Sequence, residues 1–173
     1  MPTSLYDLSV ANYLQTIPAM RGVLEKGLAH CKETGVDPGD IVAAKLADDM
    51  LPFGFQIVAV AHHAVGTIEA LKSGQFGPPR PPGSLDYPAL QQILADAEAA
   101  LTALTRPEVD ALAGRDVVFK LRGNSIPFTG ENFVLSFSLP NFHFHATTAY
   151  DILRLKGAPL GKRDYLGSLR IKT

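Results

Sequence analysis

Apolar residues recur every three or four positions along most of this chain, which is the spacing of one face of an α-helix. The first such stripe is formed by Tyr6, Val10, Tyr13, Ile17, Met20 and Leu24. It predicts a helix over about residues 4–33. Pro18 lies inside that helix and removes one backbone donor, so a kink is expected there.

A second stripe keeps the same spacing further along the chain. It consists of Leu46, Met50, Phe53, Ile57, Val60, Ala64, Ile68 and Leu71. This stripe predicts a helix over about residues 40–73, kinked where Pro52 and Gly54 interrupt it. Two further stripes predict helices over about residues 84–105 and 130–157. Pro140 is expected to kink the last helix or to begin a new segment of it.

The segments between these helices have other patterns. Residues 74–83 read GQFGPPRPPG, which is typical of an extended, partly polyproline-like connector. Residues 115–128 alternate with a period of two around Gly123-Asn124, which predicts a small β-hairpin. Pro127 should restrict the second strand to an edge. The fold class is therefore all-α: a single domain over residues 1–173, built as a four-helix bundle with a small hairpin insert.

Composition narrows the class of partner and the compartment. The 173 residues carry 16 basic and 17 acidic side chains, a net charge of -1, so neither nucleic acid nor an anionic membrane is an expected partner. Cys31 is the single cysteine, which excludes an internal disulfide and suits a reducing, cytoplasmic compartment. The N-terminus lacks the pattern of a signal peptide, and no apolar run is long enough for a membrane span.

Polar residues on the expected second helix mark its edge. At about 100° per residue, Asp49, Gln56 and His63 fall about 60°, 80° and 100° from the centre of the stripe, all on one side. Asp49 and Gln56 are either site residues or boundary residues that bond to a neighbour. For His63 the favoured interpretation is an ordinary edge histidine. His62 lies nearly opposite the stripe and is expected to be solvated.

The last expected helix carries a further candidate. Its apolar face includes His145, so this imidazole should point inward and meet the amide of Gln56 in the shared interior, with Asn141 one turn earlier. His143 lies about 160° away from His145 on a regular helix. The His-Phe-His string is therefore not a chelating pair, because side chains two positions apart diverge.

Three stretches carry a resemblance to a known family. They are SLYDLSVANYLQTI at residues 4–17, DDMLPFGFQI at 48–57 and PNFHFHATTAYDILRLKG at 140–157. Together with the order of elements, they make the whole chain similar to the DinB/YfiT-like four-helix bundle superfamily, and more closely to its branch called DUF1993. The last stretch is the most specific. The resemblance implies an up-down-down-up bundle that is often a homodimer.

The same resemblance implies a place for a metal. Many members bind one divalent metal through a histidine on the second helix and an HxxxH pair on the fourth. His145 falls where the second histidine of that pair lies, but Asn141 takes the place of the first, and Gln56 is the counterpart on the second helix. Amide oxygens are weak ligands for Zn²⁺ or Ni²⁺. A metal is thus not favoured. If one binds, it is held by His145 with Asn141, Gln56 or Asp49.

Three functions remain open. The first is a small-molecule binding protein with a polar interior pocket, whose ligand-binding candidates are Asp49, Gln56, Asn141, His145 and Tyr150. The second is a metal- or thiol-dependent transferase or hydrolase in which His145 is a general base. The third is a structural dimer without a ligand site, with His145 and Gln56 bonded to each other or to backbone. No phosphate-binding glycine loop, CxxC or GxSxG motif points elsewhere.

Overall fold

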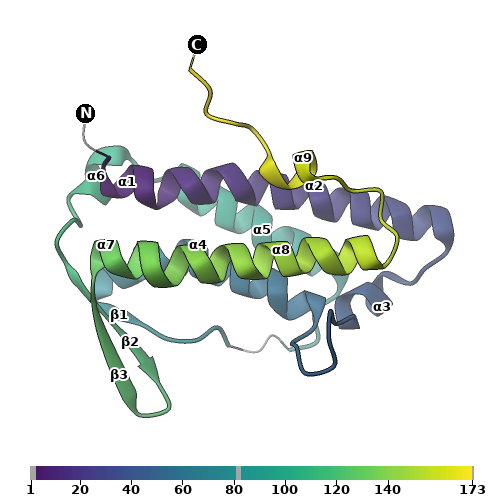
Figure 1. The fold of residues 1–173 in the computed structure, drawn as a ribbon, viewed down its shortest axis with the longest axis horizontal. Helices are drawn as coiled ribbons and strands as arrows, with labels where there is room; N and C mark the ends of the chain where they lie inside the picture. The colour runs from purple at the N-terminus through teal and green to yellow at the C-terminus, as the bar shows by residue number, and fades with distance from the viewer. Residues whose placement is uncertain (1–2, 81–82, 173) are drawn as a thin grey trace.

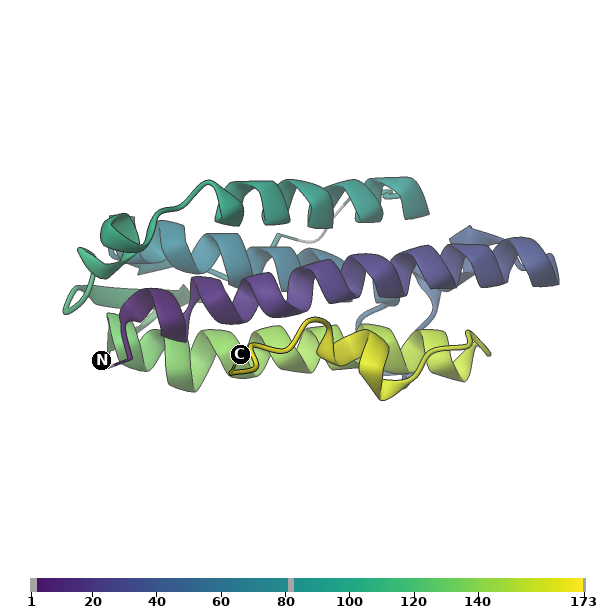
Figure 2. The ribbon, with the colours of Figure 1, turned by 90° about the horizontal axis from the view of Figure 1, so that it is seen from above.

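Four long helices lie side by side in the computed structural model (Figure 1), which describes residues 3–80 and 83–172. They are α2 (Val10–Thr34), α4 (Phe53–Ser73), α5 (Tyr87–Thr102) and α8 (Leu139–Leu155). The closest packing is between α4 and α8, between α2 and α5, and between α4 and α5. Figure 2 shows the same layout from above, with the helices roughly aligned. The chain is therefore mostly helical, as the apolar stripes predicted.

Shorter helical segments lie at the ends of the long ones. They are α1 (Leu5–Leu8), α3 (Pro38–Ala43), α6 (Arg106–Asp110), α7 (Gly130–Asn132), the π-helix η1 (Phe133–Ser138) and α9 (Lys162–Leu166). None of the helices in the described residues is long and apolar enough to cross a membrane.

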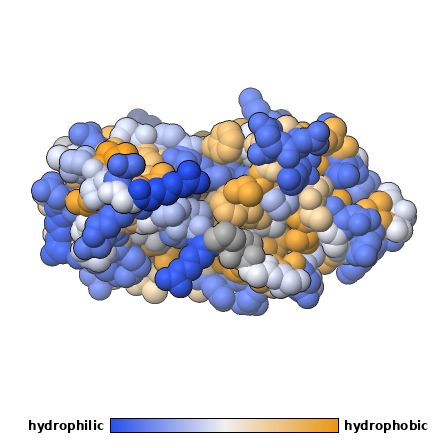
Figure 3. Space-filling model, turned by 90° about the horizontal axis from the view of Figure 1, so that it is seen from below, coloured by the Kyte–Doolittle hydropathy of each residue, from blue (hydrophilic) through white to orange (hydrophobic). Residues whose placement is uncertain are grey.

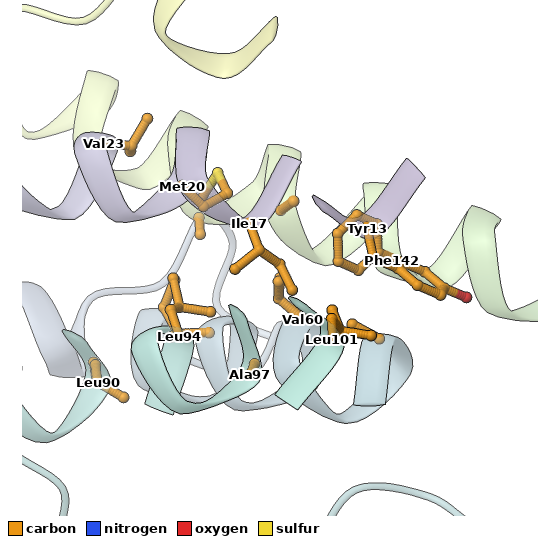
Figure 4. Close-up of a cluster of buried hydrophobic side chains, with 14 of the residues drawn as sticks. Tyr13, Ile17, Met20, Val23, Val60, Leu90, Leu94, Ala97, Leu101 and Phe142 are labelled. Atoms are coloured by element: carbon orange, nitrogen blue, oxygen red, sulfur yellow. The ribbon is translucent and has the colours of Figure 1, made fainter. Parts of the chain in front are cut away.

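The core lies between the four long helices and is formed by the predicted stripes. Tyr13, Ile17 and Met20 of α2 are fully buried, and they meet Leu94 and Leu101 of α5 in one cluster. Figure 4 shows how these side chains converge from both helices. Burying an aliphatic or aromatic side chain stabilises the fold by roughly 1.5–3 kcal/mol each, so this cluster holds α2 and α5 together.

The first predicted helix is divided near its start. Ser4 caps α1 and accepts a bond from the backbone of Asp7, and the helical pattern is interrupted at Ser9 before α2 begins. Helix α2 then runs through Pro18 and ends at Gly35, whose φ of 74° is the left-handed conformation that glycine adopts without strain.

The predicted start of the second helix is wrong. Instead of one helix from residue 40, α3 ends at Ala43, an irregular segment follows over residues 44–52, and α4 begins at Phe53. The physical reason is Pro52, which has no N–H to donate and whose ring disfavours a helical conformation for Leu51. The apolar spacing of Leu46 and Met50 continues in phase, but Leu46 is 39% exposed and does not join the core.

The predicted hairpin is confirmed, and it is part of a three-stranded sheet. Strands β2 (Asp116–Leu121) and β3 (Asn124–Thr129) pair antiparallel, and β1 (Gln75–Phe76) pairs parallel with β2. The order β1-β2-β3 places Pro127 on an edge strand, as expected. Strand β1 lies within the segment predicted as an extended connector, and it brings Phe76 against α4.

The predicted fourth helix is one continuous helical run with a wide turn. In η1 the N–H of Leu139 donates to the carbonyl of Val134, five residues back, and α8 follows with Pro140 in its first turn. Pro140 has no N–H to donate to the preceding turn, and it lies directly after the wide turn of η1. Wide turns of this kind occur frequently at functional sites.

The segment after α8 contains a short helix that the sequence pattern did not predict. Helix α9 packs on α2, where Lys26 and Asp164 form an ion pair of 2.7 Å. The side chain of Gln15 also donates to the carbonyl of Leu166. The segment after α8 therefore packs across α2.

Candidate functional site

Two histidines face each other where α4 packs against α8. His63 of α4 is buried and His145 of α8 is partly buried, and their rings stack with centroids 5.8 Å apart and an interplanar angle of 21°. His63 is therefore removed from bulk water, His145 is partly shielded from it, and the two rings are close enough to influence each other's protonation.

Gln56, one residue before Ile57 on α4, fixes the orientation of His145. Its Nε2 donates to the carbonyl of Leu51 at 2.7 Å, which leaves its Oε1 toward Nδ1 of His145, also at 2.7 Å. An amide oxygen only accepts, so Nδ1 of His145 must carry the proton. In the neutral ring, Nε2 of His145 is then an acceptor with a free lone pair. The predicted meeting of His145 with Gln56 is confirmed.

A small hollow of about 170 Å³ lies beside these two rings. Its lining consists of Phe55, His63, Phe76, Pro78, Pro79, Phe119, Phe137, Asn141 and His145. No Asp, Glu, Lys or Arg is among these residues. The hollow, named here the histidine pocket, is thus apolar and aromatic with a few polar groups, which is the usual composition of a small-molecule site.

Both imidazoles are neutral at ordinary pH. Burial lowers the pKa of His63 to about 3, with the neighbouring His145 and His62 adding to the effect. Burial also lowers the pKa of His145 to about 4. Desolvation penalises the charged form of an imidazole, and among the described residues no carboxylate lines the pocket to compensate.

His63 has an unsatisfied nitrogen. Its Nδ1 is buried without any hydrogen-bond partner among the described residues. Leaving a buried polar atom unpaired costs about 1–3 kcal/mol, and such atoms in a folded protein call for an explanation, which includes a bound molecule.

The interpretation of His63 as an ordinary edge histidine is wrong. The ring of Phe76 lies 5.4 Å from the His63 ring, and that of Phe137 lies 5.9 Å from it, and together they cover the flank of α4 that a lone helix would expose. His62 is also only partly exposed, with its Nε2 2.8 Å from the carbonyl of Gly77.

A buried hydroxyl network holds the backbone of His63. Ser138, the last residue of η1, donates to the carbonyl of His63 at 2.8 Å, and Thr67 donates to the same carbonyl. Because the single proton of Ser138 is used there, Tyr13 donates its hydroxyl to Ser138 at 2.8 Å. The network joins α2, α4 and η1, and burial raises the pKa of Tyr13 to about 12, so its proton stays in place.

The other predicted site residues are placed differently. Asn141 lines the histidine pocket, and its Nδ2 donates to the carbonyl of Phe137 at 2.7 Å. Asp49 is exposed in the irregular segment before α4, because that segment is not helical, and it does not line the pocket. Tyr150 packs against Tyr165 of α9, away from the pocket lining.

The donor set does not fit a tightly held divalent metal. No group of three or more His, Cys, Asp or Glu side chains within residues 3–80 and 83–172 could hold one. His145 and His63 are the strong donors near the pocket, while the oxygen of Gln56 is committed to His145. Two imidazoles and the weak amide oxygen of Asn141 lack the three or four good ligands that zinc sites use.

The fold and the site define a mostly helical protein with a small three-stranded sheet and a histidine-lined pocket between two helices. The chain matches the family described as "Domain of unknown function (DUF1993)" over residues 5–166, and it belongs to that family. The resemblance drawn from its sequence stretches is therefore confirmed.

A solved structure is similar over nearly the whole chain. It is the crystal structure of a DinB family member protein from Shewanella denitrificans, with 25% sequence identity and a TM-score of 0.81. The similarity covers 98% of this chain and 95% of the other. The search of curated proteins found no match.

Proposed function

We propose that this protein binds a small neutral molecule in the histidine pocket between α4 and α8. One observation carries the proposal: the unpaired Nδ1 of His63 lies in a ring stacked on His145, beside an aromatic hollow of about 170 Å³. A ligand that bonds to these imidazoles offsets the cost of burying them.

The chemistry of the lining selects the ligand. Neutral imidazoles and the absence of charged residues in the lining give no compensation for an ionic ligand, whose burial would be costly. The free lone pair on Nε2 of His145 can accept a hydrogen bond, so the ligand should carry a hydrogen-bond donor. The ligand is therefore a neutral molecule that presents an O–H or N–H group and a flat or apolar body to the phenylalanine rings.

A transferase or hydrolase with His145 as general base is less well supported. General bases work best with a pKa near the working pH, and a pKa of about 4 makes this imidazole a weak base. The donor set also offers no strong metal site to activate a nucleophile.

We also propose an architecture and an oligomeric state. We take the four long helices as the up-down-down-up bundle of a single-domain, cytoplasmic, DinB-like homodimer. The resemblance to the DinB family structure supports the bundle. Sedimentation equilibrium of the purified chain tests the dimer, and a monomer at micromolar concentration would contradict it.

Phenol tests the binding proposal, with methoxybenzene as the matched ligand that has no donor. Followed by NMR titration, phenol should bind and shift the resonances of His63 and His145. Methoxybenzene should bind about fivefold more weakly, because one hydrogen bond contributes about 1 kcal/mol.

Two variants locate the site. His145→Phe should remove the preference for phenol over methoxybenzene, and His143→Phe, at an exposed position two residues earlier, should retain it. Circular dichroism checks that both variants are folded. Two results would count against the proposal. One is that phenol does not bind the native protein, and the other is that His145→Phe still binds phenol more tightly than methoxybenzene.

A further inference from the structure

A second, larger hollow lies next to the histidine pocket. It measures about 590 Å³ and is lined by Gly39, Val42, Ala43, Leu51, Pro52, Gly54, Phe55, Gly83, Ser84, Leu85 and Asp86. Its lining is mainly apolar. Asp86 is the single charged member, and its carboxylate already accepts a bond from the backbone of Ala89 at the start of α5. This hollow is named here the apolar groove.

Phe55 connects the two hollows. It lines both of them, and its ring lies 5.9 Å from that of His145 in an edge-to-face arrangement. Phe55 is partly exposed rather than buried in the core, and it is shared by the linings of the two hollows.

One chain segment contributes to both hollows. The connector after β1 places Pro78 and Pro79 over the histidine pocket, and its later part, including Leu85, lines the apolar groove. The irregular segment before α4 lines the groove alone, through residues that include Leu51, which is 53% exposed. The carbonyl of Leu51 also accepts a hydrogen bond from Gln56, which orients His145.

The face of the molecule seen from below is mixed, and Figure 3 shows patches of hydrophobic surface between hydrophilic ones. Leu51 is one of the large exposed apolar side chains of the chain. It lies in a contiguous, mainly apolar lining, and contiguous apolar surface is what marks a ligand-binding groove.

The two hollows differ in size, and each suits a different part of one ligand. At about 30 Å³ for a water-sized group, the histidine pocket admits a head group of roughly five or six such units. Ligand sites commonly have about 300–1,000 Å³, which the apolar groove provides and the histidine pocket alone does not. The groove offers almost no hydrogen-bonding side chains, so its occupant must be apolar.

We propose that the ligand is amphipathic, with a neutral donor head in the histidine pocket and an apolar chain that passes Phe55 into the apolar groove. The inference rests on the proposed function and adds the class of molecule: a phenol, alcohol or amide that carries a hydrocarbon tail. The polar end is held by the lone pair of His145, and the tail covers Leu51.

A series of 4-alkylphenols tests the tail, from phenol through 4-ethylphenol and 4-butylphenol to 4-hexylphenol. Affinity should rise by about fourfold per added methylene once the chain reaches the groove, the gain expected for a fully buried CH₂. Isothermal titration calorimetry, or NMR for the weaker members, measures each dissociation constant.

Matched variants assign the gain to the groove. Leu51→Gln changes the side chain in the groove and keeps the backbone carbonyl that accepts from Gln56, so it should reduce the gain per methylene at least twofold. Leu46→Gln provides the control, because Leu46 lies in the same irregular segment, is 39% exposed and lines neither hollow. It should behave like the native protein.

The outcomes separate the two proposals. Phenol that binds through His145, with no gain along the series or an unchanged gain in Leu51→Gln, overturns the amphipathic ligand and leaves the histidine pocket in place. No binding by phenol or any alkylphenol overturns both. A rising series that is equal for phenols and their methyl ethers overturns the donor head.

Discussion

The side-chain oxygen of Gln56 lies 2.7 Å from Nδ1 of His145, and the amide nitrogen of the same Gln56 donates to the carbonyl of Leu51. The bond to Leu51 determines the bond to His145, because it fixes which end of the Gln56 amide faces the imidazole. A glutamine on one helix thus sets the proton position of a histidine on another.

The first prediction concerns that proton. In the native protein His145 should be the tautomer with the proton on Nδ1 and a bare Nε2, and Gln56→Leu should release this preference. Long-range ¹H–¹⁵N NMR distinguishes a protonated from a bare ring nitrogen. A native protein with the proton on Nε2 of His145 would contradict the assignment.

The second prediction is an energetic coupling between the same two residues. Gln56→Leu and His145→Phe should each destabilise the fold by about 1–3 kcal/mol, because each leaves a buried partner unpaired. The double variant should cost less than their sum by about 1 kcal/mol or more, since both partners are then apolar. Urea unfolding of the four proteins measures this cycle, and additive costs would show that the bond contributes nothing.

The third prediction is loss of stability in acid. The pKa of His63 is about 3 and that of His145 about 4 in the folded chain, below the value of about 6.5 for an unfolded one. Between these values the unfolded chain binds more protons, so the free energy of unfolding rises with pH. Full stability is present above about pH 6.5 and is lost as pH falls toward 4 and then 3.

The contribution of His63 to this loss of stability can be measured by comparing the native protein with His63→Phe. Each histidine contributes a slope of up to about 1.4 kcal/mol per pH unit. His63→Phe should flatten the dependence between pH 6.5 and 4.5 by nearly that amount, measured by urea unfolding at each pH. His143→Phe should change it less. Equal slopes in native protein and His63→Phe would show that His63 is not buried in its neutral form.

The fourth prediction concerns the hydroxyl network behind His63. Ser138→Ala should destabilise the fold by about 1–2 kcal/mol, because it removes a buried donor to the His63 carbonyl and the acceptor of Tyr13. Amide exchange in η1 should speed up. Ser136→Ala, at an exposed position of the same turn, provides the control and should leave exchange in the rest of η1 nearly unchanged. Similar exchange in both variants would show that the network does not hold this turn.

Helix positions were predictable where local spacing and packing agree. The stripes located the four long helices, and the inward face of α8 gave the meeting of His145 with Gln56. The start of α4 was not predictable from spacing alone, because Leu46 and Met50 continue the stripe although Pro52 ends the helical hydrogen bonding. Asp49 was placed beside Gln56 for that reason and lies instead in an exposed turn.

The role of His63 depends on contacts that no local pattern contains. Its angle on α4 is that of an edge residue, and its burial comes from Phe76 of β1 and Phe137 of η1, which lie far along the chain. The strand that carries Phe76 is two residues long and sits in a proline-rich segment. Its pairing with β2 gives no periodic signal, so the cover over His63 became visible only in three dimensions.

The π-helix η1 sets the angular position of everything that follows it. It holds about one more residue per turn than an α-helix does, so the extra residue is absorbed within the wide turn. If the same residues formed a regular helix, each later side chain would be rotated by about 100° around the helix axis. The imidazole that now meets Gln56 would then face another neighbour, although its own sequence neighbours had not changed. The pairing of α4 and α8 therefore depends on this upstream turn as much as on the identity of the histidine.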